Sequence, residues 1–284
     1  MTPLLKSLSW IFGHLPMRVV LAAGRGLGAV SCLFARRKHE VLSRIQDCLG
    51  VDEPEARRIR RGMYENLGMT AVEVLRQPHM RDEEVRRRMH VEGGEKLPEK
   101  GPVLLLVAHT GNWELLAASA PLLSGMPLHV VVKKLKPASL DAWMLCTRTK
   151  WGTRILDRRG SVREILRVMR DGEFLGFILD QNAKRNWGVF VDFFGKPACT
   201  SDGLSEVAAR AGAPTYPVFC RRLPDHDLLI SVGDPIPAPQ ARSPEAIQAH
   251  TQRCTAEIEA FVRLYPEQWI WMHRRWRTQP EVSA

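Results

Sequence analysis

Residues 103–116 read VLLLVAHTGNWELL and contain the transition that decides the fold class. The first five residues form an apolar run of the length expected for a buried strand, and a helical pattern begins at about Asn112 or Trp113. A strand that leads directly into a helix is the basic step of an α/β protein, and such proteins keep their sites where strands end. We therefore look for further steps of this kind, and for chemistry at His109 and the residues after it.

Apolar runs of strand length alternate with helical patterns through the rest of the chain. Strands are predicted at residues 103–107, 174–179, 216–219 and 228–232, and helices at 113–123, 161–170, 202–211 and from Ser243-Pro244 to about Leu264. The alternation predicts an α/β fold with a mixed, largely buried central sheet flanked by helices. Because neither a linker nor an internal repeat divides the sequence, we expect a single domain over residues 1–284, with a helical segment at 41–100 and the α/β core at 101–284.

The first 40 residues form an apolar segment that charges and Pro16 interrupt. Its leucine, isoleucine and valine residues recur at helical spacing, which predicts amphipathic helices. The charges leave fewer than the ~20 consecutive apolar residues that a membrane span needs. We predict helices that lie on a membrane surface, with Lys and Arg reaching the lipid head groups. One inserted helix and a pair of ordinary core helices are the alternatives.

Charge and cysteine content limit the class of binding partner and the cellular compartment that we expect. Lys and Arg outnumber Asp and Glu 41 to 31, so the surface should attract anions, whether nucleic acid, anionic lipid or phosphorylated substrates. The 6 cysteines are scattered without a CxxC pair, which favours a reducing compartment over a disulfide framework or a zinc site. We find no secretory signal and expect the protein to stay inside the cell.

His109 and Glu114 are the residues with the clearest chemical use. On one continuous helix they would lie about 140° apart, too far to pair. With His109 on the loop and Glu114 in the first helical turn, a chain reversal at Gly111 can bring the carboxylate to the imidazole. Such a carboxylate holds the proton of one ring nitrogen, so that the other can deprotonate a hydroxyl. We predict His109 as a general base with Glu114 as its partner; a structural histidine is the alternative.

Three ordered boxes carry a family resemblance. They are HTGNWE at 109–114, LDQN at 179–182 followed by GVFVDFFGKPACT at 188–200, and EQWIWMHRR at 267–275. The first resembles the H-x4-D/E box of glycerolipid acyltransferases, and the set resembles the late acyltransferases of lipid A biosynthesis. The resemblance covers residues 100–280 well and the first hundred residues only in character.

The resemblance implies an O-acyltransferase of lipopolysaccharide biosynthesis at the cytoplasmic face of the bacterial inner membrane. It implies transfer of a fatty acyl group from acyl carrier protein, or less often coenzyme A, to a hydroxyl of a membrane glycolipid, with a lipid A precursor as the first candidate. Another phospholipid, glycolipid or ornithine-type lipid is the alternative acceptor. The implied partners are the acyl carrier and an anionic lipid, without nucleic acid, metal or any cofactor beyond the acyl donor. Since a thioester needs no protein nucleophile, we expect direct attack without an acyl-enzyme.

By position, the resemblance makes His109 the general base, Glu114 its orienting partner, and Arg148 a residue that binds phosphate or the developing oxyanion. Asp180 is a second acidic residue in the site. Because it follows a very apolar strand, its carboxylate needs a buried partner such as Arg148 or a backbone turn. The remaining predicted substrate-binding residues are Asn112 and Gln181.

The C-terminal segment permits two interpretations. Trp269, Trp271 and Trp276 stand beside a run of His and Arg, a composition typical of a membrane interface. Packing of the same segment onto the sheet is the competing interpretation.

Two other classes of function compete with the acyltransferase. A non-enzymatic module that binds lipid or nucleic acid would explain the basic charge but not the His109/Glu114 arrangement. A metallohydrolase would use His109, Glu114 and Asp180 as ligands, although their spacing matches no common zinc motif.

Overall fold

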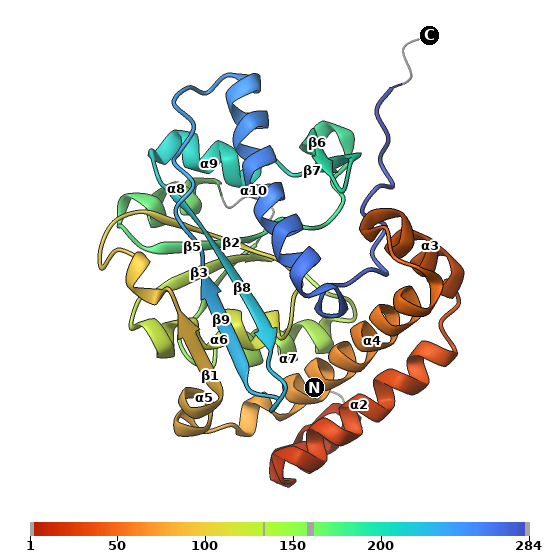
Figure 1. The fold of residues 1–284 in the computed structure, drawn as a ribbon. Helices are drawn as coiled ribbons and strands as arrows, with labels where there is room; N and C mark the ends of the chain where they lie inside the picture. The colour runs from red at the N-terminus through yellow and green to blue at the C-terminus, as the bar shows by residue number, and fades with distance from the viewer. Residues whose placement is uncertain (1–2, 133, 158–161, 282–284) are drawn as a thin grey trace.

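Seven strands form one central sheet in a computed structural model that describes residues 3–132, 134–157 and 162–281. The sheet order is β1-β9-β8-β2-β5-β3-β4, and every pairing is parallel except the antiparallel pairing of β8 with β9. The predicted mixed α/β fold is therefore confirmed (Figure 1). The strands are β1 (Met89–Glu92), β2 (Val103–Val107), β3 (Leu128–Val132), β4 (Arg154–Asp157), β5 (Phe174–Ile178), β8 (Thr215–Arg222) and β9 (Leu228–Val232).

Helices cover both faces and one end of the sheet. They are α1 (Pro3–His14), α2 (Met17–Leu33), α3 (Lys38–Leu49), α4 (Glu53–Arg76), α5 (Asp82–Arg88), α6 (Trp113–Ser124), α7 (Ala138–Arg148), α8 (Val162–Arg170), α9 (Gly203–Ala211) and α10 (Pro244–Leu264). Short 3-10 turns lie at Gln77–His79, Gly94–Lys96, Arg185–Trp187 and Pro266–Gln268, and β6 (Val189–Phe193) pairs with β7 (Lys196–Thr200) in a separate hairpin.

The residues of strand β2 pack alternately into the apolar layers on the two faces of the sheet. Val103 and Leu105 pack in the apolar layer beneath α6, whereas Leu104 packs on the other face with residues of α8 and α9. Figure 1 shows α8, α9 and α10 on that second side of the sheet. A strand that is buried on both faces has to be apolar at every position, which is why residues 103–107 form an unbroken apolar run.

The predicted helix boundaries follow local capping chemistry. The Asn112 side chain accepts a hydrogen bond from the backbone N–H of Leu115 at the start of α6, and Ser243 caps α10 in the same way. The predicted end of α10 at Leu264 is confirmed. Of the helix predicted at 161–170, Ser161 lies outside the described residues, and the rest forms α8.

The N-terminal helices pack on α4 through small residues. Pro16 separates α1 from α2 as predicted. A Cβ atom on Gly28 would lie 2.1 Å from the Tyr64 carbonyl oxygen, and one on Gly68 would lie 2.1 Å from the Gly24 carbonyl oxygen, so the α2–α4 crossing depends on glycine. Among the described residues, no single helix is long and apolar enough to cross a bilayer; α2 and α3 together have that length and composition but meet at a bend of 99°.

The C-terminal segment packs onto the protein core. Trp269 and Trp271 are buried against Phe193 and Phe194 of the β6–β7 hairpin, and Arg275 is buried beneath Phe193. The membrane-interface interpretation is therefore wrong for Trp269 and Trp271, because neither indole ring reaches the surface. The competing interpretation, packing onto the sheet, is confirmed for Trp269 and Trp271, which share a core cluster with Leu106 and Phe219, whereas Trp276 is half-buried.

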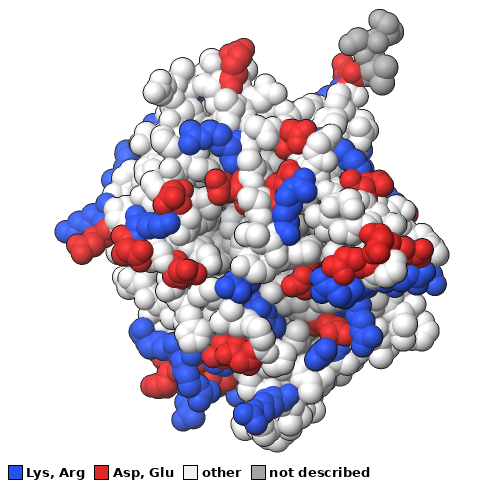
Figure 2. Space-filling model, in the orientation of Figure 1, with Lys and Arg blue, Asp and Glu red and all other residues white. Residues whose placement is uncertain are grey.

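Acidic and basic side chains are interspersed over the face of the molecule drawn in Figure 2. Pairs of opposite charge also form on helix surfaces, such as Arg57 with Glu53 and Arg58 with Glu55 on α4. The net charge of +10 is therefore not concentrated in one basic patch on this face.

Candidate active site

Two parallel strands bring His109 and Asp180 together. In the register of β2 with β5, Val107 is paired with Ile178, so the residues that follow these strands leave the same edge of the sheet. His109 Nδ1 lies 2.7 Å from Asp180 Oδ1. The backbone N–H of His109 also donates to Asp180 Oδ2 at 2.9 Å. The aspartate therefore holds both the ring and the main chain of the histidine.

Burial and charge set the protonation of this pair. Burial by itself would raise the pKa of Asp180, but the adjacent imidazole and the hydrogen bonds from His109 and Trp269 lower the pKa to about 2. Burial lowers the pKa of His109, and the Asp180 carboxylate more than offsets that effect, so the pKa of His109 lies above its usual value. Asp180 is thus a carboxylate at neutral pH, and His109 has the proton-accepting range of a general base.

Glu114 does not pair with His109, which corrects the predicted partnership. Arg148, the last residue of α7, donates to Glu114 through Nε at 2.8 Å and through Nη2 at 2.6 Å. Glu114 lies in the first turn of α6, where its carboxylate meets the end of α7; the imidazole has turned toward β5 instead. The predicted Asp180–Arg148 pair is wrong for the same reason. Glu114 still contributes to the raised pKa of His109 through its charge.

Gln181 and Trp113 lie next to the imidazole. The amide nitrogen Nε2 of Gln181 is 3.3 Å from His109 Nε2, the ring nitrogen that Asp180 leaves free. The Trp113 ring meets the imidazole edge to face, with ring centroids 5.1 Å apart. Gln181 is exposed and therefore accessible to a ligand at His109, as its predicted role requires.

Asn112 has a different place from the one we predicted. Its side chain is fully buried: Oδ1 accepts the hydrogen bond that caps α6, and Nδ2 donates to Glu73 at 2.8 Å. A side chain with both polar groups engaged in the interior has no free group to offer a substrate. Asn112 therefore fixes the loop that carries His109.

The predicted turn at Gly111 is confirmed, and α4 holds it in place. Gly111 adopts a φ of +54°, and a Cβ atom there would lie 2.5 Å from the Cys220 carbonyl oxygen, so only glycine fits. The Asn66 amide and the Thr70 hydroxyl both donate to the Gly111 carbonyl at 3.1 and 3.0 Å. The Gly111 N–H donates to the Gln268 carbonyl at 3.1 Å. Hydrogen bonds from two separate parts of the chain, α4 and the turn at Gln268, thus fix the loop.

A buried ionic cluster, which we did not predict from the sequence, lies next to this loop. Glu73 of α4 accepts from Arg88 at 2.8 Å and from Arg222 at 2.6 and 3.1 Å, in addition to Asn112. Burial would raise the pKa of Glu73, but the two guanidinium groups lower it to about 2. A signal was present in the sequence: Asn66, Thr70 and Glu73 are spaced by four and three residues, which places a polar stripe on one helical face.

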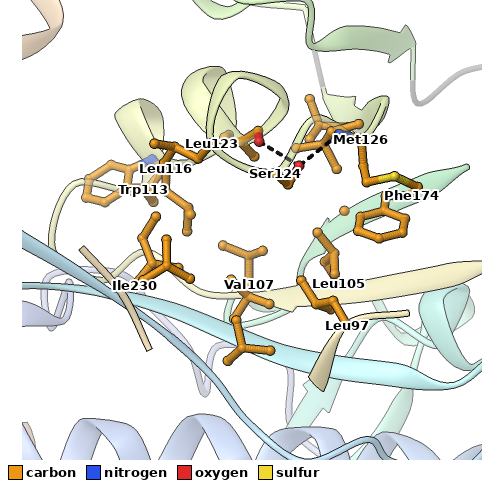
Figure 3. A pocket seen from close by; sticks show the side chains of 18 of the residues that line it. Leu97, Leu105, Val107, Trp113, Leu116, Leu123, Ser124, Met126, Phe174 and Ile230 are labelled. Atoms are coloured by element: carbon orange, nitrogen blue, oxygen red, sulfur yellow. Dashed lines mark hydrogen bonds between the residues drawn. The ribbon is translucent and has the colours of Figure 1, made fainter. Parts of the chain in front are cut away.

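An apolar cavity of about 420 Å³ is lined in part by Trp113, the ring that packs against His109. Val107 and Ile178, which end β2 and β5, line it, so the cavity reaches the same edge of the sheet as the pair. Figure 3 shows Trp113 at one end of the cavity and Phe174 with Met126 at the other. Glu114, the neighbour of Trp113, and its partner Arg148 contribute polar groups to the lining, and Ser124 contributes another beside Met126. The shape and chemistry suit a hydrocarbon chain whose reacting end lies near His109.

Within the three described ranges, no group of three or more His, Cys, Asp and Glu side chains is arranged to hold a metal ion. Glu114, one of the three ligands of the metallohydrolase alternative, is engaged by Arg148. That no metal is required stays a prediction.

Comparison with known proteins supplies the family. The model of the bacterial lipid A biosynthesis acyltransferases matches residues 4–278. The chain belongs to that family. The resemblance drawn from the three boxes is confirmed, and the protein is an O-acyltransferase.

Relatives of this acyltransferase match over nearly their whole length. A lipid A biosynthesis lauroyltransferase from Escherichia coli K12 is 26% identical over 284 residues, covering 96% of this chain and 90% of that protein. A lipid A biosynthesis palmitoleoyltransferase from the same strain is 24% identical over 285 residues, covering 95% and 89%. A crystal structure of the 1-acyl-sn-glycerophosphate acyltransferase from Thermotoga maritima aligns with a TM-score of 0.39 and 12% identity, over 87% of this chain and 97% of that one.

The three boxes of the acyltransferase meet at one carboxylate. Asp180 of the second box bonds His109 of the first, and its Oδ2 accepts the indole N–H of Trp269 of the third at 2.8 Å. Thr110 also forms an isolated β-bridge with Trp269. Segments that lie far apart in the chain therefore form one site.

Proposed function

We propose that this acyltransferase moves a fatty acyl group from the thioester of acyl carrier protein, or less often coenzyme A, to a hydroxyl of a lipid A precursor. The observation that carries the proposal is the His109–Asp180 pair, whose imidazole packs against Trp113 in the lining of the apolar cavity. The relatives named above act in lipid A biosynthesis, which favours this acceptor over another membrane lipid.

In the proposed mechanism His109 acts as the general base. Asp180 keeps the proton on Nδ1, so Nε2 accepts the proton of the acceptor hydroxyl. The hydroxyl oxygen attacks the thioester carbonyl carbon, and the C–O bond forms as the carbonyl becomes an oxyanion. When this intermediate collapses, the C–S bond breaks and the imidazolium returns its proton to the leaving thiolate. The acyl group passes directly to the acceptor, without an acyl-enzyme.

Arg148 supplies positive charge to the lining of the cavity. Glu114 engages its Nε and Nη2, which fixes the plane of the guanidinium. We propose that Arg148 faces the developing oxyanion or a phosphate of the acceptor with its remaining hydrogens, because a fixed donor in a site of low polarity stabilises such charge. Glu114 then acts by positioning Arg148.

We propose that the protein works on the cytoplasmic face of the inner membrane as a peripheral enzyme. The outer sides of α1 and α2 expose a set of large apolar side chains, which we call the N-terminal apolar surface. Lys6, Arg18 and Arg25 belong to the same helices and can meet anionic head groups. The residues of the surface are Leu4, Trp10, Ile11, Val19, Leu27, Val30, Leu33 and Phe34.

A deletion strain and a point variant test the proposal. Mass spectrometry of total lipids from the deletion strain should show lipid A that lacks one acyl chain, and expression of the wild-type chain should restore it. His109→Ala should fail to restore the chain while still sedimenting with membranes. Loss of an acyl chain from a different lipid class would identify another acceptor, and an unchanged lipidome would refute acyl transfer to any membrane lipid.

A further inference from the structure

Trp113 and Glu114 separate two cavities. On one side lies the elongated cavity of Figure 3, and on the other a second cavity of about 370 Å³ opens between α4, α6 and α7. Both side chains contribute to the lining of both cavities. The other side chains that line the second cavity are Leu67, Thr70, Ala71, Val74, Leu75 and Trp143.

The second cavity offers a ligand apolar contacts. The Thr70 hydroxyl is already used, because it donates to the Gly111 carbonyl. The Glu114 carboxylate is engaged by Arg148. A ligand that enters beyond Trp113 therefore gains free energy by removing hydrocarbon from water. An alkyl chain matches that chemistry, whereas a sugar or a nucleotide would leave its polar groups without partners.

The second cavity also lies beside the N-terminal helices. Leu75, on its wall, accepts a hydrogen bond through its carbonyl from Ser9 of α1 at 2.8 Å. Helix α1 carries the exposed Trp10 of the N-terminal apolar surface. The first cavity instead lies between the sheet and α6 and extends toward Phe174. The second cavity therefore adjoins one of the helices that we propose to meet the membrane.

We infer that the second cavity binds an acyl chain of the acceptor glycolipid, while the first cavity holds the acyl chain of the donor. The inference rests on the proposed function, in which two lipid substrates have to bring their reacting atoms to His109. The imidazole packs against Trp113, the ring that lines both cavities. With one hydrocarbon chain on each side of Trp113, the acceptor hydroxyl and the thioester carbonyl meet at the imidazole.

A matched pair of alanine-to-leucine variants tests the assignment. Ala71 of α4 lines the second cavity and Ala120 of α6 lines the first, and neither is fully buried, so leucine fills space without removing a hydrogen bond. Ala71→Leu should raise the KM for a lipid A precursor roughly tenfold and leave the KM for the acyl carrier protein donor nearly unchanged. The leucine takes the space of two or more methylene groups of the ligand, and the loss of each buried methylene weakens binding about fourfold. Ala120→Leu should raise the KM for the donor and shift the preference toward shorter donor chains.

A second measurement uses the wild-type enzyme and does not depend on how the variants fold. A lipid A precursor with a photoreactive diazirine on its acyl chain should cross-link to Leu67, Ala71 or Val74, as mapped by peptide mass spectrometry. Labelling confined to Ala117 and Ala120, or an Ala71→Leu effect on donor and acceptor alike, would overturn the assignment while the proposed function stands. Failure of the wild-type enzyme to acylate the precursor would overturn both.

Discussion

Asp180 lies 71 residues after His109 in the chain, yet its Oδ1 is 2.7 Å from the histidine Nδ1. The relationship follows from the parallel pairing of β2 with β5, which aligns the ends of the two strands. Trp269 completes the arrangement by donating to the other carboxylate oxygen. The orientation of the proposed base is therefore set by the sheet and by the C-terminal segment.

Asp180→Asn should lower kcat by about 10²- to 10⁴-fold, the range typical of losing a group that supports acid–base catalysis. The amide removes the charge that stabilises the imidazolium and no longer dictates which ring nitrogen carries the proton. Steady-state kinetics with saturating acyl donor would measure the loss. Asp192→Asn is the matched control, because that carboxylate lies in the β6–β7 hairpin and bonds the N–H of Gly195. Equal activity of the two variants would refute a role for Asp180.

The pH dependence of kcat/KM should show an acid limb governed by His109. A base must be neutral to accept a proton, so activity should rise with pH through an apparent pKa above 6.5, since the pKa of His109 is raised. In Asp180→Asn the carboxylate that raises the pKa is gone while burial still lowers it, so the limb should move to lower pH. Residual activity of the variant, measured from pH 5 to 9, would show the shift. An acid limb at the same pH in both enzymes would exclude this assignment.

Glu114 and Arg148 should behave as a unit. Their two hydrogen bonds make each side chain the support of the other, so Glu114→Gln, Arg148→Met and the double variant should lose similar amounts of activity. A double-mutant cycle on kcat/KM measures the coupling. Independent actions would instead give a double variant whose loss is the product of the two single losses.

The sequence predicted those elements that have a clear local pattern of apolar or capping residues. Residues 103–107 are apolar throughout because both faces of β2 are buried, and α10 begins directly after its capping residue Ser243. Strands β1, β3, β4, β6 and β7 were not predicted, and β1 lies in the segment predicted to be helical. The edge strands β1 and β4 have four residues each and expose polar side chains, such as Arg154 of β4, which pairs with Glu173. Edge strands are exposed to solvent and therefore lack the apolar run that marks a central strand.

Five of the six predicted site residues lie together in the structure, their roles remaining predictions, and the pairings among them were not predicted. His109, Glu114, Arg148, Asp180 and Gln181 gather at one edge of the sheet. The histidine and its carboxylate partner come from different strands, and which strands are neighbours depends on the sheet order. Glu114 was predicted as the partner of His109 because it lies nearby in the chain, whereas the register of β2 with β5 places Asp180 beside the imidazole. Pairings across a sheet require the topology, which a single sequence does not reveal.

Glu73→Gln should destabilise the protein by about 3–5 kcal/mol, the usual cost of breaking a buried ion pair. Both Arg88 and Arg222 would keep their charge in the interior without a carboxylate. Urea denaturation followed by circular dichroism measures the free energy of unfolding. Glu53→Gln on the same helix is the control, since its pair with Arg57 is exposed and worth at most about 1 kcal/mol. Matching midpoints for the two variants would show that the cluster adds nothing to stability.

The N-terminal apolar surface should control membrane binding. Leu33 and Phe34, at the end of α2, are 72% and 80% exposed, so replacing both with serine should leave the fold intact. If the two side chains insert into the bilayer, their loss should weaken binding to vesicles that contain anionic lipid by roughly tenfold or more, because the transfer of large apolar side chains out of water drives insertion. Cosedimentation with phosphatidylglycerol vesicles measures the partition. Val162→Ser is the control, because Val162 is also exposed but begins α8 on the far side of the sheet, where no membrane contact is proposed (Figure 1). Equal binding of the two variants would mean that the protein reaches its lipid substrate by another surface.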